Sequence, residues 1–139
     1  MAGTTLADVQ FFDLYSCFPA AVEIGCREIG LAEDDPRGLT VTGGLAYFGG
    51  PGNNYVTHSI AEMMRRVRAQ PGSHGLVTAI GNYVTKHSFG IYSTAPVRGA
   101  WWRENPSVLQ AQLDALPTCR FVEHASGVAT IETYTVMHS

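Results

Sequence analysis

Two hydrophobic periodicities alternate along the first hundred residues of the chain. Apolar residues recur at spacings of three and four in residues 16–31 and 54–69, which predicts two amphipathic helices. Four short apolar stretches rich in β-branched and aromatic residues predict strands. These stretches are residues 8–14, 39–48, 76–80 and 89–94. The order strand, helix, strand, helix, strand, strand indicates an α/β layered unit that closes with a hairpin.

The first expected helix has a recognisable start, and two helices are too few to cover both faces of a sheet. Ser16 is a plausible N-cap of the first helix, with Pro19 in its first turn. Two helices would leave one face of a sheet open. We therefore expect an additional N-terminal portion or a partner chain to cover that face.

The pattern changes after Pro96. A capped helix is predicted from Pro106 to about Leu116, and two strand candidates lie around Gly127. We therefore expect residues 1–96 to form the α/β domain, itself incomplete. Residues 97–139 should form a linker and the beginning of a small, β-rich additional domain.

Composition narrows the class of protein. The chain has 139 residues, of which 45% are apolar and 15% are charged, as expected for a globular protein. A net charge of −3 with scattered basic residues argues against nucleic-acid binding. No apolar run reaches the ~18 residues of a membrane span, and the N-terminus lacks a secretory pattern, so we expect a cytoplasmic protein. The three cysteines form no metal-binding motif.

The segment from Gly49 to Asn54 is the first candidate for chemistry. It consists of small and turn-forming residues between a predicted strand and a predicted helix. Such a turn presents backbone N–H groups and the positive end of a helix to an anion or an oxyanion. The segment lacks the Lys and Ser/Thr of a phosphate-binding loop and the spacing of a dinucleotide-binding loop. Tight packing and ligand contact both remain open as explanations.

Two single residues are further candidates. His87 follows Lys86 at a predicted strand connection, where it would be either a general acid/base or an ordinary surface histidine. Cys17 lies at a strand-to-helix junction, where it would be either an activated nucleophile or a buried thiol. No base is recognisable beside Cys17 in the sequence.

Three ordered segments resemble the C-terminal domain of the thiolase superfamily. "AGTTLADVQFFDLYSCFPAAVEIG" resembles the strand that runs into the Asn-Glu-Ala-Phe or His-Asp-Cys-Phe motif. "LTVTGGLAYFGGPGNN" resembles the strand and Gly-His-Pro loop, and "GLVTAIGNYVTKHSFGIYS" resembles the closing hairpin. The closest likeness is to acetyl-CoA acetyltransferase-like proteins of the type 1 thiolase-like group, whose additional C-terminal domain "QAQLDALP" and "ATIETYTV" resemble.

The resemblance implies a site but also three departures from it. Thiolases use a nucleophilic cysteine from the N-terminal half, a histidine, a second cysteine, and an Asn- or His-bound water. Here Tyr15 stands in the Asn or His position, Gly50 in the histidine position, and Ile80 or Gly81 in the position of the second cysteine. Tyr15 and His87 are the candidate catalytic residues. The implied substrate-binding residues are Gly49, Gly50, Pro51, Gly52, Asn53 and Asn82.

The resemblance implies the C-terminal portion of an acyltransferase that binds acyl-CoA and transfers or thiolytically cleaves acyl groups, inactive by itself. The alternative is a noncatalytic CoA-thioester-binding or partner subunit, which the missing histidine and cysteine favour. A CoA thioester would be the substrate or ligand, with no other cofactor. The implied partners are a missing N-terminal thiolase half or partner chain, with a homo-oligomer as a further possibility, and neither nucleic acid nor a membrane.

Overall fold

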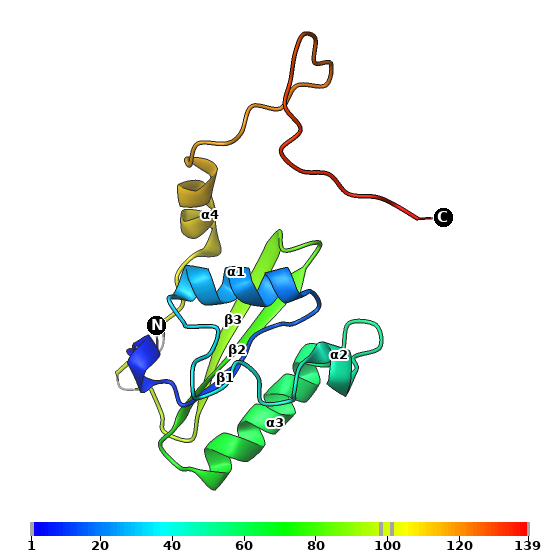
Figure 1. Ribbon diagram of the computed structural model, residues 1–139. Coiled ribbons are helices and arrows are strands. Elements are labelled where there is room, and N and C mark those ends of the chain that lie inside the picture. The colour runs from blue at the N-terminus through cyan, green and yellow to red at the C-terminus, as the bar shows by residue number, and fades with distance from the viewer. Residues whose placement is uncertain (1, 98, 101, 139) are drawn as a thin grey trace. The chain divides into compact units, whose positions relative to one another are not determined.

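The computed structural model describes residues 2–97, 99–100 and 102–138. The chain divides into two compact units, residues 1–103 and 104–139, which are described separately. The elements of the first unit can be followed in Figure 1. In chain order they are η1 (Leu6–Asp8), β1 (Phe11–Asp13), α1 (Pro19–Ile29), α2 (Leu45–Phe48), α3 (Tyr55–Ala69), β2 (His74–Gly81) and β3 (Lys86–Ser93).

The three strands form one sheet in the order β1-β2-β3. β1 pairs in parallel with β2, with Phe12 opposite Leu76, and β2 pairs antiparallel with β3, with Val77 opposite Gly90. The parallel pair needs a long crossover, which α1, α2 and α3 supply. The predicted α/β class and closing hairpin are therefore confirmed.

α1 covers one face of the sheet. Phe12, Leu14 and Leu76 form a buried cluster with Cys26 of α1 and with Leu31. Burial raises the pKa of the Cys26 thiol, with smaller contributions from nearby carboxylates. Cys26 is therefore an inert core residue.

α3 covers the opposite face, where Val77 packs with Met63 and Val67 and where Phe11 joins the cluster. Adjacent residues of a strand point to opposite faces, so Phe11 and Phe12 serve different helices. The expectation that one whole face would be open is wrong, because each face has its own helix. β3 is largely exposed.

The predicted strand over residues 39–48 is wrong. Leu39 accepts one backbone hydrogen bond from Leu14, but Gly43 and Gly44 adopt left-handed φ angles of 94° and 93°. A strand cannot pass through two such residues, so the chain turns and then forms the short helix α2. Local β propensity was therefore overruled by the two glycines.

The two long predicted helices of the first unit are confirmed, with one change at the start of α1. The N-cap is Phe18, in an extended conformation, and Pro19 is the first helical residue. Gly30, at a left-handed φ of 75°, ends the helix. Ser16 is therefore not the cap, and its hydroxyl bonds elsewhere.

The second unit contains the helix α4 (Pro106–Asp114), which confirms the third predicted helix. The Asn105 side chain caps it by accepting a hydrogen bond of 3.0 Å from the Ser107 N–H. The two predicted strands around Gly127 are not formed, since the described residues after α4 contain no strand. A strand needs a neighbour for its backbone hydrogen bonds, and these residues are exposed without one. The domain boundary at residue 96 stays a prediction, as does the additional domain.

Candidate functional site

Three segments meet where β1 ends, and we call residues 13–18, 40–50 and 55–59 together the β1 junction. The Ser16 hydroxyl oxygen accepts a hydrogen bond of 2.9 Å from the N–H of Leu45 at the start of α2. The Tyr15 N–H donates to the Thr78 hydroxyl of β2 at 2.8 Å. The junction is thus tied to both α2 and the sheet.

Asp13, the last residue of β1, is fully buried at the centre of this junction. One carboxylate oxygen, Oδ2, accepts hydrogen bonds from the Thr40 hydroxyl at 2.9 Å and the Val41 N–H at 3.0 Å. The other, Oδ1, accepts from the Tyr55 hydroxyl at 3.1 Å and the Ser59 hydroxyl at 2.6 Å. The Thr42 hydroxyl makes a longer contact of 3.4 Å with Oδ2. Among the described residues no ion pair includes Asp13, so hydrogen-bond donors compensate its burial.

Tyr55 lies behind the glycine-rich segment. Its buried ring meets the Tyr15 ring edge-on at 5.4 Å between centroids, and the Phe48 ring at 6.4 Å. A Cβ atom on Gly50 would lie 2.7 Å from the Tyr55 Cβ, which is too close for any side chain. At Gly50 the packing explanation therefore holds, and Tyr55 occupies the space where a side chain at residue 50 would begin.

The rest of the glycine-rich segment lies at the surface. Gly49 and Gly52 have left-handed φ angles of 80° and 63°, and Pro51 and Asn53 are exposed. Asn54 precedes α3 without a side-chain cap bond, and its buried Oδ1 has no hydrogen-bond partner among the described residues. Substrate contact by Gly49, Gly50, Pro51, Gly52 and Asn53 stays a prediction.

Tyr15, within the junction, is half-buried. Burial raises the pKa of its phenol above the ordinary 10.0, and the nearby Cys17 and Tyr55 raise it further. Tyr15 is therefore protonated at neutral pH and available as a hydrogen-bond donor.

The β2–β3 hairpin tip, residues 82–85, reaches the β1 junction through one aromatic contact. Asn82, Tyr83 and Val84 have left-handed φ angles of 51°, 54° and 69°. The exposed Tyr83 ring stacks on the Phe18 ring at 6.5 Å with an interplanar angle of 17°. The backbone carbonyl of Asn82 accepts hydrogen bonds from Thr85 within the turn. A substrate-binding role for Asn82 stays a prediction.

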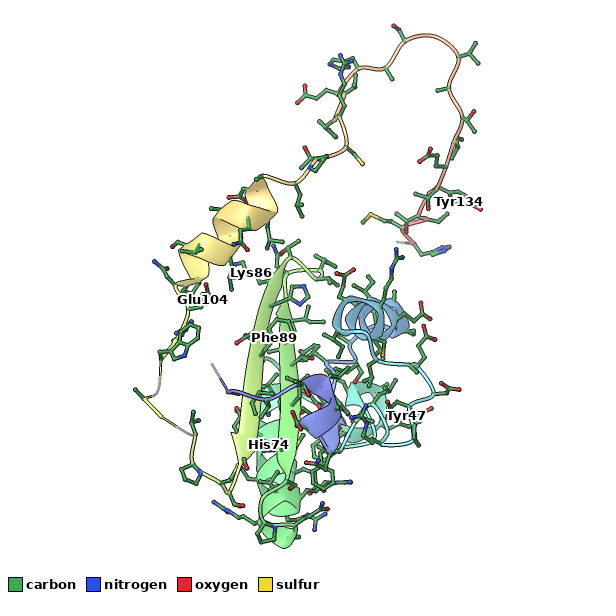
Figure 2. All side chains as sticks on the ribbon, turned by 90° about the vertical axis from the view of Figure 1, so that its left-hand side faces the viewer. Tyr47, His74, Lys86, Phe89, Glu104 and Tyr134 are labelled. Atoms are coloured by element: carbon green, nitrogen blue, oxygen red, sulfur yellow. The ribbon has the colours of Figure 1, made fainter. Side chains whose placement is uncertain are left out.

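His87 lies inside β3, so its expected place in the strand connection is wrong. Its Nε2 is 2.7 Å from the Val84 carbonyl oxygen, and its ring stacks with Phe89 at 6.2 Å. In the described part of the chain no hydrogen bond or ring contact joins His87 to Tyr15 or to residues 49–54. Figure 2 shows Lys86 near the hairpin tip and Phe89 further along β3, and both side chains are exposed. An acid/base role for His87 stays a prediction.

Sequence reasoning missed the polar centre of the junction, which consists of Asp13, Thr40, Tyr55 and Ser59. One signal was available, because "VQFFDL" places a single carboxylate inside an otherwise apolar strand. A charge in such a run is rare unless it is paired or hydrogen-bonded. The donors lie 27 to 46 residues away in the sequence, so no local pattern predicts them.

Other kinds of site have little support within the described residues. A shallow depression of about 450 Å³ lies beside Thr42, Phe48, His58 and Arg65, and neither Tyr15 nor His87 lines it. The described residues hold no group of three potential metal-ligating side chains. No helix among them is long and apolar enough to cross a membrane.

The three-stranded α/β unit, with a glycine-rich segment between the β1 junction and a long helix, is thiolase-like. A crystal structure of a monomeric SCP2-thiolase-like protein type 1 from Mycobacterium smegmatis matches 84% of this chain at 54% identity, with a TM-score of 0.77. The resemblance to the thiolase superfamily is therefore confirmed, and the chain has a thiolase-like fold. No protein-family model and no curated protein sequence matches the chain.

The match also limits which properties of the mycobacterial protein can be inferred for this chain. The chain spans 25% of the length of that mycobacterial protein. That protein is described as monomeric, so the comparison does not support the expected partner chain or homo-oligomer.

Proposed function

We propose that this chain supplies part of the CoA-thioester site of a thiolase-like acyltransferase of the acetyl-CoA acetyltransferase-like group. The observation that supports this most strongly is the match at 54% identity, which includes a thiolase-like fold. A CoA thioester would be the substrate or ligand and acyl-CoA the partner, without another cofactor. A cytoplasmic location and a role in lipid metabolism are parts of the same proposal.

The β1 junction suggests how the chain would contribute to this site. Tyr15 is protonated at neutral pH and half-buried, so its phenol could donate a hydrogen bond to a thioester carbonyl oxygen. The exposed surface of the adjacent glycine-rich segment offers little side-chain bulk, which permits close approach of a ligand. The nucleophilic cysteine expected of a thiolase is not assigned to any residue of this chain.

The second candidate is a noncatalytic protein that binds a CoA thioester. The specific observation in its favour is the position of Tyr55, whose Cβ would lie 2.7 Å from a Cβ on residue 50. An imidazole therefore cannot be attached at this position without a shift of α3 or of the loop. His87 is bonded to the Val84 carbonyl outside the junction, and His58, which belongs to the junction, has its ring 5.3 Å from the Phe48 ring.

Binding and turnover separate the two candidates. Titration of the 139-residue chain with acetyl-CoA, followed calorimetrically, should give saturable binding that Tyr15→Phe weakens. Tyr47→Phe is the matched control, because Tyr47 is 92% exposed. Absence of any acetyl-CoA binding would contradict both candidates.

Turnover is tested by thiolysis of acetoacetyl-CoA after addition of an N-terminal thiolase half. Cleavage that is reduced by His87→Ala would support the acyltransferase, and His124→Ala in the second unit serves as the control. Binding without cleavage would support the noncatalytic alternative.

A further inference from the structure

We propose that Asp13 is the positioning residue of the β1 junction, and that its carboxylate determines the conformation of the turn from Thr40 to Gly44 and the place of Tyr55. This inference rests on the proposed function only in so far as the junction binds a CoA thioester. Asp13 itself is fully buried and would not touch the ligand.

The first step concerns the turn. The Thr40 hydroxyl has one hydrogen, which it donates to Asp13 Oδ2 at 2.9 Å. Its oxygen accepts from the backbone N–H groups of Thr42, Gly43 and Gly44 at 3.1, 3.2 and 3.1 Å. The Gly44 N–H is shared with the Thr42 hydroxyl oxygen at 3.2 Å. One side chain thus binds three successive backbone amides in a turn in which both glycines have left-handed φ angles. The carboxylate sets the direction of the hydroxyl on which the turn depends.

The second step concerns Tyr55. Its hydroxyl also has one hydrogen, donated to Asp13 Oδ1 at 3.1 Å. The Thr42 hydroxyl lies 2.6 Å from the Tyr55 hydroxyl, 3.0 Å from the Thr40 hydroxyl and 3.4 Å from Asp13 Oδ2. With the Tyr55 hydrogen donated to Asp13, the shortest of these contacts is one in which Thr42 donates to the Tyr55 oxygen. Thr42 belongs to the turn and Tyr55 to α3, so the carboxylate orders both sides of the junction at once.

The third step connects this order to the ligand-facing surface. Tyr55 lies against the Tyr15 ring and next to Gly50. Gly44 is the N-cap of α2, and the N–H of Leu45, which follows it, donates to the Ser16 hydroxyl. A displacement of either the turn or Tyr55 would therefore move the wall around Tyr15. An apolar residue at position 13 could fill the same volume, but it would leave several buried donors without an acceptor.

Amide hydrogen exchange on the 139-residue chain, measured residue by residue by NMR, tests the inference with Asp13→Asn. Asparagine keeps the shape but has one neutral acceptor oxygen in place of two charged ones. Because hydrogen bonds to a charged acceptor are stronger than bonds to a neutral one, we expect exchange of the Val41–Gly44 amides to become about tenfold faster. Acetyl-CoA affinity should fall by a similar factor.

Ser59→Ala is the matched control. It removes the 2.6 Å bond to the same carboxylate on the α3 side and leaves every bond of the turn in place. Global stability should fall, but exchange at the turn should change by less than about threefold relative to the rest of the chain. Thr40→Val, which removes the turn's acceptor directly, should reproduce the faster exchange seen with Asp13→Asn.

The outcomes are distinguishable. Wild-type exchange rates in Asp13→Asn would overturn the inference, and so would a turn loosened equally by Ser59→Ala. Faster exchange at the turn with unchanged acetyl-CoA affinity would mean that Asp13 orders the fold but not the site. That result would also overturn the inference. If the wild-type chain binds no acetyl-CoA, the proposed function fails, whereas the exchange experiment still decides whether Asp13 orders the turn.

Discussion

The β1 junction and the β2–β3 hairpin tip both contain residues that the resemblance assigns to a site, but they are built in opposite ways. The junction surrounds a buried carboxylate whose oxygens accept hydrogen bonds from four donors in two segments, residues 40–41 and 55–59. The hairpin tip is exposed and holds three consecutive non-glycine residues in the left-handed region. The first region is stabilised by satisfied polar contacts, and the second retains backbone strain.

This difference affects how each region can respond to a ligand. A buried, fully bonded network moves only if several bonds break together, so the junction should behave as a fixed wall. A strained, exposed turn opens more readily and is typical of segments that move on binding. We therefore expect substitutions to cost most at the junction and least, or even to stabilise, at the hairpin tip.

The largest effect is expected for Gly50→Ala. The added Cβ would lie 2.7 Å from the Cβ of Tyr55 and 3.2 Å from its Cα, so the backbone of α3 or of the loop has to shift. We expect a loss of about 2–3 kcal/mol in the free energy of unfolding, measured by urea denaturation. Gly52→Ala, where an added Cβ meets nothing within 4 Å, should cost only the left-handed strain, about 1 kcal/mol. Equal losses would mean that Tyr55 does not restrict residue 50.

Tyr55→Phe should have the next largest effect. It removes the hydroxyl that donates to Asp13 and accepts from Thr42 while keeping the ring in place. Loss of a bond to a buried charged acceptor should lower the free energy of unfolding by about 1–3 kcal/mol, measured from the same urea transitions. Tyr47→Phe is the control, because Tyr47 projects from α2 into solvent (Figure 2). An unchanged free energy of unfolding in Tyr55→Phe would contradict the central position of this hydroxyl.

Val84→Gly tests the hairpin tip in the opposite direction. A β-branched residue at a φ of 69° is strained, and glycine adopts this conformation without steric cost. We expect the free energy of unfolding to rise by about 1 kcal/mol, seen as a higher thermal midpoint. This figure already subtracts the cost of the entropy that glycine adds to the unfolded chain. Asn82→Gly should gain less, because asparagine tolerates this region better than valine. Destabilisation by Val84→Gly would show that the tip is not strained.

The smallest effect concerns pH at the outer edge of the junction. Hydrogen bonds from Arg65, and secondarily from Arg66, lower the pKa of Glu62 from 4.5 to about 2 despite a raising effect of burial. Arg66 also donates to the Val41 carbonyl at 3.2 Å, which links Glu62 to the turn. The folded pKa is depressed, so the stabilisation is fully present above pH 4.5 and is lost as the pH falls towards 2.

Glu62→Gln should therefore lower stability at neutral pH but not at strongly acidic pH, by urea denaturation. The loss should stay below about 1 kcal/mol, because the Arg65 side chain is 68% exposed and solvent screens the pair. High salt should reduce the difference further, since exposed ion pairs are screened. A difference that persists unchanged at strongly acidic pH would contradict the ion-pair origin.

The helices and the hairpin could be predicted because their signals are local. Residues 55–69 show one apolar stripe at helical spacing, and Pro106 follows a capping asparagine at the start of α4. Two strand predictions were wrong because the conformation of both segments depends on contacts that a local sequence pattern does not show. Residues 39–44 have the composition of a strand, but the Thr40 hydroxyl gathers their amides into a turn. Residues 118–138 have strand-like composition but no strand to pair with among the described residues.

The sequence alone determined the α/β class, the two long helices and the closing hairpin, the thiolase resemblance and the absence of a side chain at Gly50. Only the tertiary structure decided what that absence means. Tyr55 fills the space beside Gly50 because its hydroxyl is held by Asp13, a residue 42 positions earlier in the chain. Periodicity and composition report the contacts between residues close in sequence, whereas the satisfaction of a buried charge depends on donors that only folding brings together.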